Sequence, residues 1–309
     1  MKAIIKIGTR GSQLALYQAE LVKTKIEAEF PLVQVEIIKI KTSGDMIRRS
    51  GTHPMETKRI YTKEIEEALL HRDVDIAVHS AKDMAVILPD GLKLSAALER
   101  EDARDCLISK DHKKLSELGI GARIGTSSLR RKKQLLRYHT EIIVQEMHGN
   151  VDSRIRKMSE GEYDAIVLAY AGIKRLGYTQ YVSEIFPEEQ FYPAPGQGII
   201  VIQSRSGDSE VDEILGPLNH AETAKRLLCE RAFLRRLEGG CQLPCGITSE
   251  ISRGALQVKG ALFDVESHDF IEAEHSGSDQ SAESVGVELA EKILADGGQK
   301  ILDALRHVS

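Results

Sequence analysis

Cys241 is the residue of this sequence best suited to nucleophilic chemistry. It lies in LEGGCQLPCG (237–246), directly after two glycines, in a stretch that holds two of the four cysteines. A metal site would need further Cys or His ligands nearby, and the C-x3-C spacing has no matching pair. Cys106, Cys229 and Cys245 lie in apolar or proline-bounded settings and are expected to be packing thiols. The pattern favours Cys241 as an accessible thiolate on a flexible turn.

A second group of residues places positive charge at the predicted ends of strands. GTSSLRR (125–131) offers hydroxyl and backbone N–H groups at a helix start, which suits an anion. The candidates are Arg10 and Ser12 in GTRGS, Ser80 and Lys82 in HSAKD, Thr126, Ser128, Arg130 and Arg131 in GTSSLRR, Arg154 in NVDSRIRK, and Arg175 in GIKRLG. Each arginine alone has the alternative of a solvated surface position. Together, in a chain of formal net charge −5, they predict a local site for a polyanionic ligand.

Asp83 is the one carboxylate among these cations. It follows Lys82 directly, so a simple salt bridge is one interpretation. The alternative is functional, because a carboxylate in such a place can stabilise a developing positive charge or accept a hydrogen bond from a ligand N–H.

Composition limits the classes of protein. The 309 residues predict two or three domains, and 41% hydrophobic with 29% charged residues is typical of a soluble globular chain. No apolar run reaches 18 residues and no secretory leader is evident. The few cysteines indicate reduced thiols and a cytoplasmic protein, and the acidic balance gives no general attraction to nucleic acid or membranes.

The elements that must position these residues alternate between strand and helix. A helix with Leu14, Tyr17, Leu21 and Ile26 on one face is expected after Ser12, its N-cap. Strands are expected at 3–7, 33–41 and 74–83, and a further helix at 62–70. This alternation predicts βαβ units and a mostly parallel sheet.

Two sequence motifs each occur twice, in the same order along the chain, which predicts two similar lobes. IGTRGSQLAL (7–16) is echoed at 124–135, and DIAVHSAKD (75–83) is echoed at 164–172. The charged stretch 99–105 is expected to cross between the lobes, FYPAPGQG (191–198) to return, and the strand at 199–203 to rejoin the first lobe. A helix from 221, a strand at 255–263 and a helix at 281–295 predict a third domain. The expected boundaries are 1–98 with 199–216, 104–192, and 221–309.

The motifs GTRGSQLAL, DIAVHSAKDM, EREDARD, GTSSLRRKKQL, GNVDSR, YDAIVLAYAGIKRLG, PGQG and LEGGCQLP follow the order of the porphobilinogen deaminase (hydroxymethylbilane synthase) family, which this chain resembles from residue 4 to about 246. The resemblance implies an α/β fold of three domains. The first two are doubly wound, like the lobes of type II periplasmic binding proteins, with the active site between them. The third is a small α/β domain with an antiparallel sheet.

The resemblance also implies a cytoplasmic, monomeric transferase of haem biosynthesis. Such enzymes join four porphobilinogen molecules head to tail, release ammonia, and free the linear tetrapyrrole hydroxymethylbilane by hydrolysis. A dipyrromethane cofactor on Cys241 is implied, with Asp83 as the catalytic group that contacts pyrrole N–H groups and stabilises the azafulvene cation. Cofactor binding is implied for Ser80, Lys82, Thr126, Ser128, Arg130 and Arg131, and substrate binding for Arg10, Ser12, Lys58, His148, Arg154, Arg175 and Gln197.

The chain departs from the family at three places. ETKRIY (56–61) stands where the family has a glycine-rich loop. Lys58 is kept and Tyr61 replaces a phenylalanine. Because the family's glycines are absent, the backbone of this segment is expected to have less conformational freedom. His148 stands where the family has an arginine, and neutral imidazole cannot replace a permanent bidentate cation. Ser43 stands at an often basic position. These changes leave two alternatives open: a diverged relative that elongates weakly, and a two-lobed binding protein for a small anion.

Overall fold

The computed structural model of the chain describes residues 2–44, 61–238, 243–267 and 269–308. Cys241 and Lys58, two of the predicted site residues, lie outside these ranges. The chain divides into two compact units, Met1–Glu101 with Ile199–Ala224, and Asp102–Gly198 with Lys225–Ser309. No helix in the described part of the chain combines the length and the apolar character that a membrane span requires.

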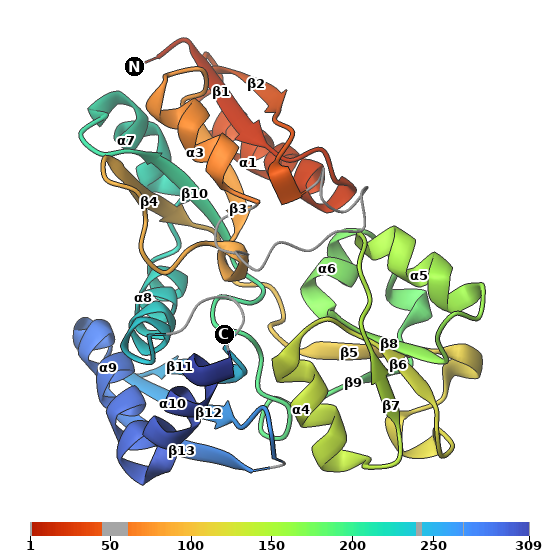
Figure 1. The fold of residues 1–309 in the computed structure, drawn as a ribbon. Coiled ribbons are helices and arrows are strands. Elements are labelled where there is room, and N and C mark those ends of the chain that lie inside the picture. Colours follow the sequence, from red (N-terminus) through yellow and green to blue (C-terminus); the bar gives the residue numbers. More distant parts are fainter. Residues whose placement is uncertain (1, 45–60, 239–242, 268, 309) are drawn as a thin grey trace. The chain divides into compact units, whose positions relative to one another are not determined.

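The first unit is built on one five-stranded sheet with the order β2-β1-β3-β10-β4 (Figure 1). Its strands are β1 (Ile4–Thr9), β2 (Gln34–Lys39), β3 (Ile76–Ser80), β4 (Leu92–Ala97) and β10 (Ile200–Arg205), and its helices are α1 (Gln13–Glu29), α3 (Lys63–Leu70) and α7 (Ser209–Leu215). The strand β10 comes from far along the chain and pairs with β3 and β4. The predicted return of the chain to this sheet is therefore confirmed.

Helix α1 begins where the sequence predicts, and Leu21 and Ile26 of the predicted face pack in the core. Ser12 is the N-cap, and its hydroxyl accepts a hydrogen bond from the backbone N–H of Ala15 at 3.3 Å. The buried residues are Gln18, Ala19, Val22 and Ile26. Tyr17 is 42% exposed, so the predicted stripe through Tyr17 is wrong.

The second unit contains a sheet of matching topology, with the order β7-β6-β8-β5-β9. Its strands are β5 (Asp105–Ser109), β6 (Arg123–Gly125), β7 (Ile143–Gln145), β8 (Ala165–Ala169) and β9 (Glu184–Ile185), and its helices are α4 (Leu129–Tyr138), α5 (Val151–Ser159) and α6 (Tyr170–Arg175). Both five-stranded sheets therefore carry the same pattern of strand neighbours, as the repeated motifs predict.

Each of these sheets has four strands in one direction and a single strand antiparallel to them, so the prediction of a mostly parallel sheet is confirmed. In the first, β1 pairs in parallel with β2 and β3, whereas β10 is antiparallel to both of its neighbours. In the second, β6 pairs in parallel with β7 and β8, whereas β5 is antiparallel to β8 and β9. Strands β10 and β5 follow the crossing segments rather than a helix of the same lobe, so the βαβ rule does not set their direction.

The second unit also holds a three-stranded antiparallel sheet, β11-β12-β13, as expected for the third domain. Its strands are β11 (Cys245–Ser252), β12 (Ala255–Phe263) and β13 (Phe270–Ser278), and the accompanying helices are α8 (Ala221–Arg236), α9 (Ala282–Ile293) and α10 (Gln299–Val308). A Cβ at Gly286 of α9 would overlap the backbone of Cys229 of α8. This glycine therefore permits close packing of the two helices over the sheet.

Candidate active site

A small pocket of about 60 Å³ lies in the first unit, beyond the carboxyl ends of β1 and β3. Four predicted site residues line it: Arg10, Ser12, Ser80 and Asp83. The remaining lining residues are Leu14, Ala15, Gln18, Tyr61, Thr62, Val78 and His79. Ligands of open α/β sheets bind at such strand ends, and a carboxylate beside a guanidinium can hold a ligand that carries both N–H donors and carboxylates.

One hydrogen bond and one cation–π contact connect residues that line this pocket. Gln18 of α1 donates from Nε2 to Oγ of Ser80 at 2.9 Å. The Arg10 guanidinium lies 4.3 Å from the centre of the Tyr61 ring, a cation–π contact. Asp83 ends a short 3-10 turn, Ala81–Asp83, that follows β3 directly and leaves its side chain exposed. The segments that directly follow β1 and β3 therefore supply the predicted polar residues of the pocket.

His79 is a pocket residue that the sequence did not single out. It is 6% exposed, and its Nε2 has no hydrogen-bond partner among the described residues. Burial lowers the pKa of His79 to about 4; the charge of Arg10 acts in the same direction and the Gln203 side chain acts against it. Oγ1 of Thr62 is likewise buried without a partner. The neutral imidazole of His79 and the hydroxyl of Thr62 therefore line the buried side of the pocket. A single histidine in a predicted strand does not by itself indicate a functional role.

In the second unit, one buried carboxylate gathers three of the predicted site residues. Asp105 is 0% exposed and accepts hydrogen bonds from Nη1 of Arg130 at 2.7 Å, from Nε and Nη2 of Arg131 at 3.0 and 2.7 Å, and from Nε2 of Gln197 at 3.0 Å. We call these four residues the Asp105 cluster. Burial opposes ionisation of Asp105, but the charges of Arg130 and Arg131 outweigh it and hold the pKa of this carboxyl well below its usual range.

Backbone carbonyls complete the Asp105 cluster. Arg130 Nη1 also donates to the carbonyl of Tyr192 at 2.5 Å, and Arg131 Nη1 donates to that of Val167 at 3.2 Å. Gln197 Nε2 donates to the carbonyl of Ala103 at 2.6 Å. Asp105 lies in EREDARD, which the sequence predicts only as a crossing segment. An acid at the start of an apolar strand, with two arginines in the next helix, was the available signal.

The hydroxyl groups of GTSSLRR serve their own helix. Ser128 is the N-cap of α4, and its Oγ accepts a hydrogen bond from the N–H of Arg131 at 3.4 Å. Thr126 is 3% exposed, and its Oγ1 accepts from the N–H of Ser128 at 3.2 Å. These contacts stabilise the first turn of α4, which carries Arg130 and Arg131.

Three further predicted site residues of the second unit, two arginines and a histidine, lie outside the Asp105 cluster. Arg154 donates from Nε to the carbonyl of Gly149 at 2.9 Å, and Arg175 from Nη2 to that of Gly198 at 2.6 Å. His148 has a half-exposed side chain, with Nε2 at 3.4 Å from a carboxylate oxygen of Glu146. The fold therefore gives each of them a separate local anchor.

The three described cysteines are packing residues, as expected. Cys106, Cys229 and Cys245 are all buried, and burial raises the pKa of each to about 12. A thiol of that kind stays protonated at neutral pH and is a poor nucleophile. Within the described ranges, no group of three or more His, Cys, Asp or Glu side chains is arranged to hold a metal ion.

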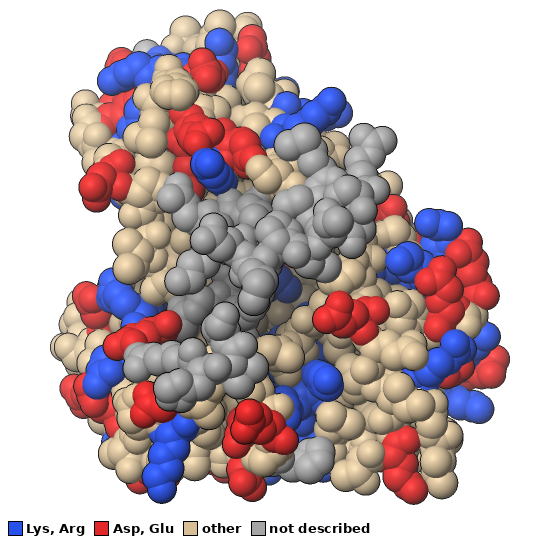
Figure 2. Space-filling model, in the orientation of Figure 1, with Lys and Arg blue, Asp and Glu red and all other residues tan. Residues whose placement is uncertain are grey.

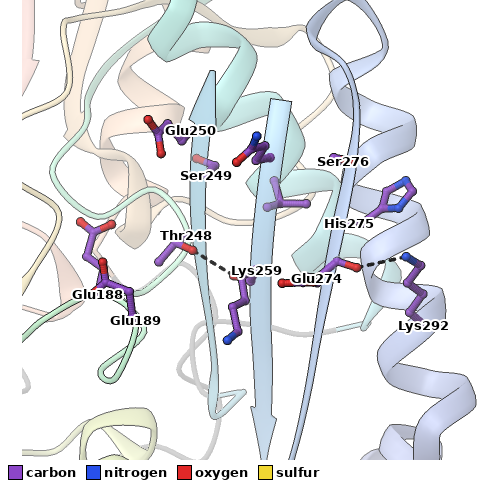
Figure 3. Close-up of a pocket in the computed structure, with 12 residues that line it drawn as sticks. Glu188, Glu189, Thr248, Ser249, Glu250, Lys259, Glu274, His275, Ser276 and Lys292 are labelled. Atoms are coloured by element: carbon purple, nitrogen blue, oxygen red, sulfur yellow. Dashed lines mark hydrogen bonds between the residues drawn. The ribbon is translucent and has the colours of Figure 1, made fainter. Parts of the chain in front are cut away.

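A larger groove of about 580 Å³ lies in the second unit, between Glu188 and Glu189 and the three-stranded sheet, and none of its lining residues is a predicted site residue. Figure 3 shows Glu188 and Glu189 on one side of it and β11, β12 and β13 on the other. Lys292 donates from Nζ to the carbonyl of Glu274 at 3.0 Å. On the face that Figure 2 shows, acidic and basic side chains are interspersed over each unit rather than gathered into one field.

The comparisons with known proteins agree over nearly the whole chain. Residues 5–213 match the model of the porphobilinogen deaminase dipyrromethane cofactor binding domain, and residues 224–295 match the model of the porphobilinogen deaminase C-terminal domain. A porphobilinogen deaminase from Carboxydothermus hydrogenoformans is 42% identical over 307 residues, 99% of each chain. Another, from Trichlorobacter lovleyi, is 44% identical over 299 residues, 97% of this chain and 96% of that one.

Solved structures of binding proteins are similar at a lower level. A putative methionine-binding lipoprotein from Bacillus subtilis is 12% identical with a TM-score of 0.45, over 73% of this chain and 94% of that chain. An ancestral arginine-binding protein bound to arginine is 16% identical with a TM-score of 0.39, over 71% and 91%. The domain models and the two close relatives identify the protein at the level of the family: the chain belongs to the porphobilinogen deaminases, a family of enzymes with a dipyrromethane cofactor.

Proposed function

We propose that this protein joins four porphobilinogen molecules into the linear tetrapyrrole hydroxymethylbilane, with release of ammonia, as a cytoplasmic monomer. The observation that carries the proposal is the pocket of the first unit, where Asp83 lies with Arg10, Ser12 and Ser80. Porphobilinogen has a pyrrole N–H, an amine and two carboxylate arms. One carboxylate, one guanidinium and two hydroxyl groups complement these features.

Asp83 is proposed as the catalytic residue. Loss of ammonia leaves positive charge on the pyrrole ring, and a carboxylate held close to that charge lowers the free energy of the charged state. The same carboxylate accepts a hydrogen bond from the pyrrole N–H and so orients the ring. Asp83 is exposed at the edge of the pocket, so its oxygens are accessible to substrate.

The cationic and polar residues are proposed to bind carboxylate arms. We assign substrate binding to Arg10, Ser12, Lys58, His148, Arg154, Arg175 and Gln197, and cofactor binding to Ser80, Lys82, Thr126, Ser128, Arg130 and Arg131. Gln197 is fully buried, and its amide donates hydrogen bonds to Asp105 and to the carbonyl of Ala103. Guanidinium groups suit carboxylates because they form two parallel hydrogen bonds.

The donors of the second unit fit a dipyrromethane, since its arms are carboxylates and the Asp105 cluster contains two guanidiniums for one carboxylate. When bound, the dipyrromethane supplies the primer for chain growth. We propose Cys241 as the residue that holds it through a thioether. The buried state of the three other thiols supports this choice.

Intact-mass analysis of protein from a porphobilinogen-producing host tests the proposal. We expect wild type to carry a two-pyrrole increment and to release hydroxymethylbilane from porphobilinogen. Cys241→Ser should lose the increment, whereas Cys245→Ala, a change at a buried thiol of the same stretch, should keep it. An unmodified wild type, or an increment that persists in Cys241→Ser, contradicts the assignment.

A further inference from the structure

The Asp105 cluster holds an excess of positive charge in a buried region. Asp105, Arg130 and Arg131 are 0%, 5% and 7% exposed, so a single carboxylate is shared by two guanidiniums. The carboxylate of Asp102, an acid three positions before Asp105, forms an ion pair with Arg104 at 2.6 Å. Its negative charge is therefore directed to Arg104 and not to the second guanidinium of the Asp105 cluster. Buried charges are normally paired, and an uncompensated one favours the binding of an opposite charge.

The two arginines present different edges to Asp105. Arg131 donates from both Nε and Nη2 to the same oxygen, Oδ1, so its Nε and Nη2 edge is occupied by Asp105. Among the described residues, Arg130 makes its two hydrogen bonds through Nη1, one to Oδ2 of Asp105 and one to the carbonyl of Tyr192. The N–H groups of Nε and Nη2 of Arg130 therefore stay outside the cluster. That edge can bind a carboxylate in bidentate fashion.

The backbone carbonyl of Tyr192, which accepts a hydrogen bond from Arg130, is held in place by Gln134. The N–H of Tyr192 donates to Oε1 of Gln134 at 2.6 Å, and its carbonyl accepts from Nε2 of Gln134 at 3.1 Å as well as from Arg130. Gln134 lies on α4, one turn after Arg130, and is fully buried. The position of the Arg130 guanidinium is therefore set by two fixed acceptors, the Asp105 carboxylate and this carbonyl.

We propose that Asp105 is a positioning residue, which holds Arg130 by Nη1 so that its Nε and Nη2 edge binds a carboxylate arm of the dipyrromethane. Asp105 acts through Arg130 and does not itself contact the arm. Arg131 and Gln197 occupy the other oxygen and keep the carboxylate from turning. This inference rests on the proposed function for the identity of the ligand, whereas the arrangement of Asp105 and Arg130 is independent of it.

The test measures cofactor loading in Asp105→Asn. An amide cannot neutralise two guanidiniums, so Arg130 should lose its fixed orientation. We expect the porphobilinogen concentration that gives half-maximal loading, followed by intact mass, to rise at least about tenfold, the loss expected for one charge-assisted hydrogen bond. A merely structural role would instead reduce the fraction of folded protein without moving that concentration. Asp164→Asn is the matched control, because it removes an exposed aspartate–arginine pair from the same lobe.

Asp105→Glu provides a second measurement that keeps the charge and moves it by one methylene. We expect it to fold and to load more weakly than wild type, and it decides the question if Asp105→Asn does not fold. Wild-type loading in a folded Asp105→Asn, or in Asp105→Glu when Asp105→Asn is unfolded, overturns the inference. A wild-type protein that takes up no pyrrole increment at all would instead contradict the proposed function.

Discussion

Arg10 and Asp83, 73 positions apart in the sequence, line the same pocket of about 60 Å³ in the first unit. The parallel pairing of β1 with β3 brings their loops to one edge of the sheet. A permanent cation and an exposed carboxylate therefore face one small ligand volume, and their contributions can be separated by mutation.

Replacement of Asp83 by Asn should reduce catalysis far more than binding. The shape of the side chain is kept, but the negative charge that stabilises the developing cation is lost. We expect kcat to fall at least about 100-fold with a small change in KM. Steady-state porphobilinogen consumption measures both, with Asp90→Asn as the control for an exposed aspartate of the same unit that is not among the lining residues. An Asp83→Asn enzyme with wild-type kcat would refute the catalytic assignment.

His79 should make the protein less stable in mild acid. Its pKa in the folded chain is about 4, below the ordinary 6.5. Between pH 6.5 and pH 4 the unfolded chain therefore binds a proton at His79 that the folded chain does not bind. Stability that is present above pH 6.5 is therefore lost as the pH falls towards 4, by up to about 3 kcal/mol.

Urea unfolding of wild type and His79→Gln at several pH values between 7 and 4.5 measures this effect. Carboxylates that are ion-paired in the fold contribute to the acid sensitivity of both proteins, so the variant serves as the reference. We expect the wild type to lose more stability than His79→Gln over the range. Parallel curves would show that His79 is not held neutral by burial.

Replacement of His148 by Arg should strengthen substrate binding. The side chain is half-exposed and lies near Glu146, so a longer side chain can extend into solvent. An arginine adds a permanent charge and a bidentate edge for a carboxylate arm, and we expect KM at pH 8 to fall about tenfold. His148→Gln, which can donate but carries no charge, is the control. Equal KM values for His148→Arg and wild type would show that no carboxylate arm reaches this position.

The sequence by itself determined the family, the order of the elements and the local caps. Two of the motifs that carry the resemblance, GTRGSQLAL and GTSSLRRKKQL, contain a turn between a strand and a helix, where short-range hydrogen bonds restrict the residue types. Ser12 is the clearest example, because an N-cap interacts with an N–H only three residues away. The buried thiols were also predictable, since an apolar segment that contains a cysteine has little reason to expose it.

Only the tertiary structure decided which charges are free to meet a ligand. The sequence grouped Arg130 with Arg131 as equivalent cations, but Asp105 takes the bidentate edge of Arg131 and one nitrogen of Arg130. The partners of Asp105 are 25, 26 and 92 positions away, and no local pattern sets such distances. Burial and ion pairing depend on the path of the whole chain, so the roles of His79 and Asp105 could be recognised only when that path was known.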